Sequence, residues 1–373
     1  MQIDFANLKI QHNLYKEEIE EAILKVARDC NFIMGSQIDE LERNLEKFTG
    51  SKYAISCSSG TDALLLAMMA LDIQPDDEII TTPFTFFATA ETIAFLKAKP
   101  VFVDIDEKTY NIDPSKIEAA ITPKTKAIIP VSLYGQPCDI DEIQAIVDKT
   151  LKTKNQKLYT IIDGAQSFGS TYKGISDSNL GDISCTSFFP AKPLGCYGDG
   201  GALFTNDEKL ADKIKSLRLH GQSIRYHHQY IGMGGRLDTI QAAVLNVKLK
   251  YYGKDLKLRQ DVAEKYTQAL NAKNIETPFV KNDRTSAWAQ YSIRVQNRTE
   301  LQTKLQNLGI PTAVHYPMPL HVQECFKYLN LKEGDFPISE KVSKEIMSLP
   351  MNPYVSDEEI EFIVENLAKE LRC

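Results

Sequence analysis

The strongest constraint on the fold is an alternation of short apolar stretches with helix-like stretches over the first two-thirds of the chain. The apolar stretches are rich in Ile and Val, and they predict strands at 52–56, 77–82, 100–106, 125–135 and 158–163. Helical periodicity separates them, and near-continuous apolar strands are typical of strands that are covered on both faces. We therefore expect an α/β fold built on a mostly parallel sheet.

The last third of the chain has a smaller pattern of its own. Residues 236–252 predict one long helix that leads out of the sheet unit. Strands and helices then alternate again, at 289–296, 298–309, 311–316 and 356–371. A chain of 373 residues is long enough for one large and one smaller domain. We expect a large domain over 1–250 and a small C-terminal α/β domain over 251–373.

Composition and charge exclude several classes of protein. The net charge is −7 and the pI is near 5.5, which argues against a general nucleic-acid binder, because such domains are usually basic. Residues 1–21 carry scattered charges and no apolar core, so we expect no signal peptide. No run reaches the roughly 18 apolar residues that a membrane span needs. These features predict a cytoplasmic protein with no nucleic-acid partner and no membrane segment.

The cysteines are scattered, with no C-x-x-C pair and no histidines at zinc spacing, so we expect no metal site. We expect reduced thiols that mostly pack in the interior. They are Cys30, Cys57, Cys138, Cys185, Cys196, Cys325 and Cys373.

Lys192 stands where a solvated charge is unusual, after an apolar run and before a glycine-rich turn. Upstream, the apolar strand LYTIID ends at Asp163, and Gln166 follows closely. Pyridoxal phosphate (PLP) needs a lysine and a carboxylate in such a pair. Its aldehyde forms a Schiff base with a lysine amine, and its ring nitrogen stays protonated only beside a carboxylate. Alone, Lys192 could extend to the surface and Asp163 could cap a helix. Together, they favour a PLP site.

Further signals fall at strand ends, where ligands bind in open parallel sheets. In SSGTDA, a Ser-Ser-Gly-Thr turn leads into a helix, and the free N–H groups there, with the Thr61 hydroxyl, predict a phosphate cradle. In FTFFAT, Phe86 could lie flat against an aromatic cofactor, although a phenylalanine taken alone is more often a core residue.

A family resemblance covers essentially the whole chain. It rests on SSGTDALLLA, TPFTFFATAETI, IIDGAQSFGSTYKG, TSFFPAKPLGCYGDGGALFTND, GGRLDTIQAAVL and PTAVHYPMPL, in that order. This set resembles the DegT/StrS-type PLP-dependent sugar aminotransferases, which have the aspartate aminotransferase-like PLP fold type I. Within that family, the motifs are most similar to enzymes that aminate the 3-keto group of a nucleotide-linked sugar acid, UDP-2-acetamido-3-oxo-glucuronate.

The resemblance implies roles by position. Lys192 would bind PLP covalently and move the proton, and Asp163 would hold the pyridinium N–H. Gln166 would contact the ring, and Phe86 would stack on it. The phosphate would be bound by Ser59, Gly60, Thr61 and Ser187. Arg236, His315 and Tyr316 would lie near the sugar. The family forms homodimers with shared active sites, uses glutamate as amino donor, and acts on nucleotide-linked keto sugars.

The chain departs from the family at Gly234, where relatives often carry an Asn that reaches the partner chain's cofactor phosphate. We expect His227 and His228 to lie in a loop near the interface without a direct chemical role. Other functions stay open: amination of a dTDP-linked 3-keto-6-deoxyhexose, amination at C4, or a non-catalytic PLP-fold binding or regulatory protein. Lys192 argues against the related dehydratases, which carry His there, and the glycine spacing argues against a nicotinamide site.

Overall fold

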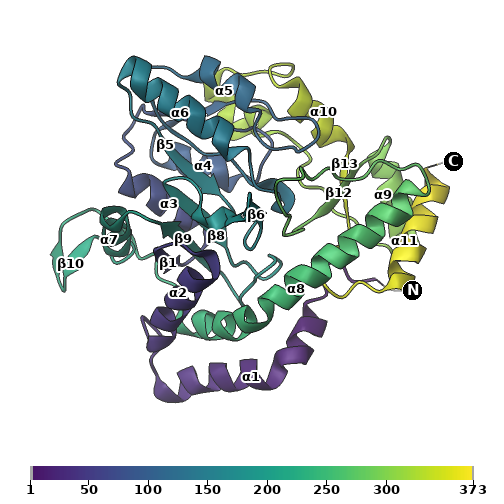
Figure 1. The fold of residues 1–373 in the computed structure, drawn as a ribbon, viewed down its shortest axis with the longest axis horizontal. Coiled ribbons are helices and arrows are strands. Elements are labelled where there is room, and N and C mark those ends of the chain that lie inside the picture. Colours follow the sequence, from purple (N-terminus) through teal and green to yellow (C-terminus); the bar gives the residue numbers. More distant parts are fainter. Residues whose placement is uncertain (1–2, 372–373) are drawn as a thin grey trace.

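The computed structural model describes residues 3–371, and its centre is a seven-stranded sheet (Figure 1). In spatial order the strands are β1 (Tyr53–Cys57), β9 (Gly201–Thr205), β8 (Ile183–Ser187), β5 (Tyr159–Asp163), β4 (Thr125–Ile128), β2 (Glu78–Thr81) and β3 (Lys99–Phe102). Strands β8, β5, β4, β2 and β3 pair in parallel, and β9 runs antiparallel to both of its neighbours. The expected mostly parallel α/β sheet is therefore confirmed.

Helices cover both faces of this sheet. The sheet unit contains α1 (Leu8–Asp29), α2 (Ser36–Thr49), α3 (Gly60–Ala70), α4 (Ala88–Phe95), α5 (Pro114–Ala120), α6 (Ile140–Lys154) and α7 (Glu208–Leu217). Successive strand residues enter different cores: Ile161 packs in the cluster of α3 and α7, whereas Ile162 packs in the cluster of α5 and α6. This two-sided burial explains why the strands are apolar at almost every position.

A smaller lobe follows α8 (Thr239–Asn271), the long helix that runs from the sheet unit toward the C-terminal elements in Figure 1. The lobe contains β12 (Tyr291–Arg294), α9 (Arg298–Asn307), α10 (Pro337–Glu345), β13 (Ile346–Leu349) and α11 (Asp357–Glu370). Its core is formed by apolar residues of α8, β12, α9, β13 and α11. Helix α8 is continuous through residue 250, and the division of the chain at that position stays a prediction.

The strands of the lobe differ from the expectation at two places. The expected strand at 311–316 makes only an isolated bridge, between Ala313 and Ser348, while Ile346–Leu349 pairs with Tyr291–Arg294 as an antiparallel strand that the sequence pattern missed. Minor two-stranded pairs complete the structure: β6 (Thr171–Tyr172) with β7 (Ile175–Ser176), and β10 (Gln222–Ile224) with β11 (His227–His228).

Four cysteines are buried (Cys57, Cys138, Cys185 and Cys196), Cys30 and Cys325 are exposed, and Cys373 lies outside the described residues. Between residues 3 and 371, no helix has the length and apolar character that crossing a membrane requires.

Candidate active site

The residues expected to bind PLP lie at one edge of the sheet. Asp163 ends β5 and Ser187 ends β8, while α3 begins three residues after β1 and Phe86 follows β2. Because the carboxyl ends of parallel strands meet at the same edge, the topology brings these four segments together.

Asp163 is held in a fixed orientation inside this edge. It is only 5% exposed, and its Oδ2 accepts a hydrogen bond of 2.7 Å from the Thr89 hydroxyl. Its Oδ1 accepts a second bond of 3.2 Å from the Ala165 N–H. Burial raises the pKa of the carboxyl above its ordinary value, and the two hydrogen bonds and the Lys192 ammonium oppose this rise. A nearby cation therefore stabilises the ionised form of this buried carboxylate strongly.

Gln166 connects the sheet edge to the C-terminal lobe. Its Oε1 accepts a bond of 2.6 Å from the Tyr134 N–H, and its Nε2 donates one of 3.0 Å to the Tyr316 hydroxyl. The Tyr134 hydroxyl donates to the His315 carbonyl. Gln166 and Tyr316, far apart in the sequence, are thus direct neighbours.

Lys192 lies in the turn between β8 and β9, where its N–H donates to the Phe189 carbonyl at 2.8 Å. Its side chain is partly buried, and no described residue forms a hydrogen bond or an ion pair with its ammonium. Burial lowers the pKa of this ammonium, and the Asp163 carboxylate opposes that shift. A lysine in this state loses its proton more readily than one in water and is a better nucleophile.

The N-terminus of α3, where a phosphate cradle is expected, has free backbone donors. The Ser59 side chain caps the helix by accepting a bond of 3.0 Å from the Asp62 N–H. The N–H groups of Gly60 and Thr61 have no acceptor among the described residues, as is usual in a first helical turn. A Cβ at Gly60 would lie 2.7 Å from the Ser187 Cβ, so only glycine lets α3 approach β8 this closely. Free donors and a close approach suit a phosphate group.

Phe86 is 55% exposed, so it is not a core residue. It lies in the turn before α4, and its ring centroid is 6.0 Å from that of Tyr316. An exposed ring beside Tyr316 suits a flat cofactor. The set of unpaired donors, a held carboxylate, an unpaired lysine and an exposed aromatic ring therefore fits PLP.

Two of the three residues expected near the sugar, His315 and Tyr316, lie beside this group. The His315 Nδ1 lies 3.0 Å from the Ser348 Oγ, and burial together with the Lys192 charge lowers the pKa of His315 to about 4. Tyr316 contacts Gln166 and Phe86 as described. Arg236 is separate: it is half-buried before α8, its Nη2 lies 3.9 Å from the Cβ position of Gly234, and within residues 3–371 it forms no hydrogen bond or ion pair.

The sequence interpretation missed Thr89, Tyr134 and Ser348, which orient Asp163, Gln166 and His315. Thr89 lies inside the motif TPFTFFATAETI, three residues after Phe86, and this spacing on a helix start is the one signal that could have identified it.

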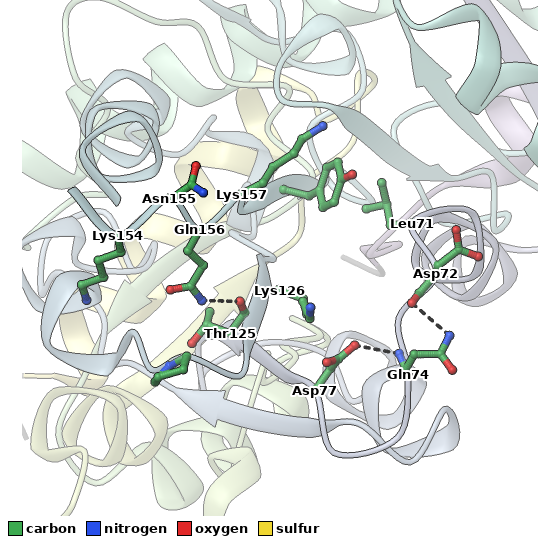
Figure 2. A pocket seen from close by; sticks show the side chains of 12 residues that line it. Leu71, Asp72, Gln74, Asp77, Thr125, Lys126, Lys154, Asn155, Gln156 and Lys157 are labelled. Atoms are coloured by element: carbon green, nitrogen blue, oxygen red, sulfur yellow. Dashed lines mark hydrogen bonds between the residues drawn. The ribbon is translucent and has the colours of Figure 1, made fainter. Parts of the chain in front are cut away.

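A hollow of about 950 Å³ opens elsewhere, at the amino ends of β4 and β5 (Figure 2). Lys126, Lys154 and Lys157 line it together with Asp72 and Asp77. Because it lies at the opposite end of the strands from Asp163 and Ser187, it is not part of the candidate active site.

Comparison with known proteins gives matches over almost the whole chain. The model of the DegT/DnrJ/EryC1/StrS aminotransferase family matches residues 13–368. The UDP-2-acetamido-2-deoxy-3-oxo-D-glucuronate aminotransferase of Pseudomonas aeruginosa is 50% identical over 97% of this chain and 98% of its own. A DegT/DnrJ/EryC1/StrS aminotransferase from Brucella abortus has a similar structure, with a TM-score of 0.94, 38% identity, and coverage of 99% of this chain and 100% of its own. NtdA from Bacillus subtilis, solved with bound cofactor PMP, gives a TM-score of 0.91 at 30% identity, covering 100% of this chain and 86% of its own.

Proposed function

The chain belongs to the DegT/DnrJ/EryC1/StrS aminotransferase family, whose members bind PLP, and on that premise we propose that it aminates a nucleotide-linked 3-keto sugar. Glutamate is the amino donor, and the preferred acceptor is UDP-2-acetamido-2-deoxy-3-oxo-glucuronate. The observation that carries this substrate is the 50% identity to the Pseudomonas aeruginosa aminotransferase named for that sugar, over 97% of this chain.

The cofactor supplies an aldehyde that takes up the amino group and a cationic ring that draws electrons from the reacting carbon. We assign Lys192 to hold the cofactor covalently and to carry the proton. The lowered pKa of its ammonium and its lack of a partner in the described chain support this role, since both leave the amine free to react. We assign Asp163 to keep the ring nitrogen protonated. Its two hydrogen bonds, from Thr89 and Ala165, hold the carboxylate in place for that contact.

Other groups position the cofactor. We assign the free N–H groups at Gly60 and Thr61, with the hydroxyls of Ser59 and Ser187, to the phosphate, where the positive end of the α3 dipole also favours an anion. The exposed face of Phe86 would cover the ring.

The sugar side is assigned to three residues. His315 is neutral at physiological pH because its pKa is about 4, so it can donate or accept a hydrogen bond without adding charge. Tyr316 presents a hydroxyl that Gln166 already orients. The half-buried Arg236 has no described protein partner and suits the sugar carboxylate, because a guanidinium binds a carboxylate through two parallel hydrogen bonds.

We further propose a homodimer with shared active sites. The β10–β11 hairpin projects from the body beside α7 (Figure 1), and its apolar side chains are strongly exposed, with Tyr226 at 79% and the adjacent Ile231 at 93%. Exposed apolar side chains on a projecting segment are typical of a surface that binds another protein chain. Gly234 and Arg236 follow directly, which supports a site that the partner chain completes. We place the enzyme in the cytoplasm, where its amino-sugar product would serve the synthesis of surface polysaccharide such as lipopolysaccharide.

The substrate is tested with two acceptors that differ in the carboxylate. We expect the enzyme, loaded by glutamate, to aminate the UDP-linked keto-uronate faster than a dTDP-linked 3-keto-6-deoxyhexose, with 2-oxoglutarate as co-product. Arg236→Ala should raise KM for the uronate on the order of 10-fold or more, matching the roughly 1.5–3 kcal/mol of a hydrogen bond to a charged group, and should change KM for the deoxy sugar far less.

Arg28→Ala is the control, because Arg28 pairs with Glu21 on the exposed face of α1. Faster turnover of the deoxy sugar by the parent enzyme would replace the uronate assignment with the dTDP-sugar alternative. Absence of any glutamate-dependent reaction would favour the non-catalytic alternative.

A further inference from the structure

A second lysine is buried beside the loop that carries Lys192. Lys248, on α8, is only 3% exposed, and within the described chain it has no carboxylate partner. Its Nζ donates a hydrogen bond of 2.7 Å to the Gly195 carbonyl and lies 4.7 Å from the centre of the Tyr197 ring. Burial lowers the pKa of its ammonium to about 8, with Cys196 and Asp255 opposing the shift. A buried charge costs free energy unless its contacts compensate for it. The burial of Lys248 with only these two contacts therefore needs an explanation.

The Gly195 carbonyl belongs to a closed loop. The Cys196 N–H donates to the Phe188 carbonyl at 2.8 Å, and the Phe188 N–H donates to the Gly200 carbonyl at 2.7 Å. A Cβ at Gly195 would lie 2.4 Å from the Pro190 carbonyl oxygen, so the chain folds back tightly on itself here. Because Lys192 lies inside this loop, a displacement of Gly195 is transmitted to the backbone of Lys192.

Helix α8 holds this loop and its neighbour from one face. Gln241, seven residues before Lys248, accepts a bond of 2.8 Å from the Tyr197 N–H. Tyr252, four residues after Lys248, donates one of 2.5 Å to the Phe168 carbonyl, just beyond Gln166. Residues at these spacings share a helix face. The three side chains therefore fix, from one rigid element, the loop that carries Lys192 and the turn that follows Asp163.

We propose that Lys248 is a positioning residue for Lys192: by holding the Gly195 carbonyl, its ammonium sets the direction from which the Lys192 amine meets the cofactor aldehyde. The proposal rests on the assigned role of Lys192. Lys248 is not among the residues assigned to the cofactor or the substrate, and its contacts are to Gly195 and Tyr197. Its contribution is geometric, and a misplacement of about 1 Å at a reacting group can cost on the order of 10²-fold in rate.

The test separates covalent capture from simple binding. Pyridoxamine phosphate uses the phosphate cradle and Asp163 but forms no bond with Lys192, whereas PLP does. In Lys248→Met, which removes the donor at similar volume, we expect capture of PLP by the apoprotein to slow on the order of 10-fold or more. The capture is followed by the absorption of the lysine-bound cofactor. The dissociation constant for pyridoxamine phosphate should stay within about 2-fold, well below a tenfold (1.4 kcal/mol) change.

Lys250→Met is the matched control, since Lys250 lies on the exposed face of α8 and pairs with Glu18, and it should change neither quantity. Lys248→Gln keeps a donor and should recover part of the capture rate; it also serves if Lys248→Met does not fold. Unchanged capture in both Lys248 variants, or an equal loss for both cofactor forms, would overturn the positioning role. Failure of the parent to bind PLP at Lys192 would instead refute the proposed function.

Discussion

Three groups in the candidate site have pKa values that differ from those in water, and burial is the first cause of each shift. It raises the pKa of Asp163, lowers that of Lys192, and lowers that of His315 to about 4. The site thus contains a neutral imidazole, an amine that loses its proton readily, and a carboxylate that is most stable beside a cation. This combination is suited to covalent attachment of a cofactor with a protonated ring.

Replacing the carboxylate by an amide removes the charge that keeps the ring cationic. We expect Asp163→Asn to bind PLP but to lose on the order of 10²-fold or more in the glutamate half-reaction, as when a positioned electrostatic group is removed. Stopped-flow absorbance measures the rate. Asp182→Asn is the control, because Asp182 is an acid at the opposite end of β8. We expect this variant to carry out the glutamate half-reaction at the rate of the parent. A parent-like rate in Asp163→Asn would mean that another group supports the ring.

His315 makes stability depend on pH in a defined window. Its folded pKa of about 4 lies below the ordinary histidine value of 6.5, so between these pH values the unfolded chain binds a proton that the folded chain does not. The stabilising effect is complete above pH 6.5 and is lost as the pH falls toward 4. We expect His315→Asn to reduce the decrease in melting temperature across this window relative to the parent. Identical pH dependence of the two melting temperatures would contradict the shifted pKa.

At the scale of elements, helices and strands with a periodic apolar pattern could be predicted from the sequence. The ends of these elements, where the site residues lie, were predicted less accurately. The pattern of residues 83–97 predicts a helix over that range, but the helix begins only at Ala88, because the residues before it form a turn that leaves Phe86 exposed. The helix expected at 236–252 begins at Thr239 and continues to Asn271. Local periodicity indicates that a helix exists, whereas its ends depend on tertiary contacts that the pattern does not contain.

The junction of α3 and β8 offers a test at this scale. Gly60→Ala places a Cβ 2.7 Å from that of Ser187, so the two elements must separate and the free N–H groups must shift. We expect PLP affinity to fall at least 10-fold in equilibrium dialysis, a loss of about 1.4 kcal/mol. Gly253→Ala is the matched control: nothing lies near that position in α8, and it should leave affinity unchanged while stabilising the helix by roughly 0.5–1 kcal/mol. If Gly60→Ala binds PLP with the affinity of the parent, the assignment of the phosphate to the N-terminus of α3 is wrong.

For the whole molecule, the fold class could be predicted because a buried parallel sheet leaves a local apolar pattern in every strand. The contacts that complete the site could not. Thr89 meets Asp163 across 74 residues, and Gln166 meets Tyr316 across 150. Nothing in the local sequence relates these pairs. Their proximity follows from the order of the strands and from the way the C-terminal lobe packs against the sheet.

The dimer is tested through the projecting hairpin. A double variant, Ile224→Asp in the hairpin with Ile231→Asp just after it, replaces two strongly exposed apolar side chains with charged ones. We expect it to shift the protein from dimer toward monomer in light scattering, and to weaken PLP retention if the partner chain completes the site. Leu151→Asp, on the exposed part of α6, should leave the dimer intact. A monomeric parent, or a dimer unaffected by the double variant, would contradict this interface.

The assignment of Lys192 is tested most directly by locating the covalent bond. The protein is incubated with PLP, reduced with borohydride, digested, and analysed by mass spectrometry. We expect the pyridoxyl group on the peptide that contains Lys192, and its absence when glutamate converts the cofactor to the amine form before reduction. Labelling of the nearby Lys248 instead, or no labelled lysine at all, would contradict the site described for this enzyme.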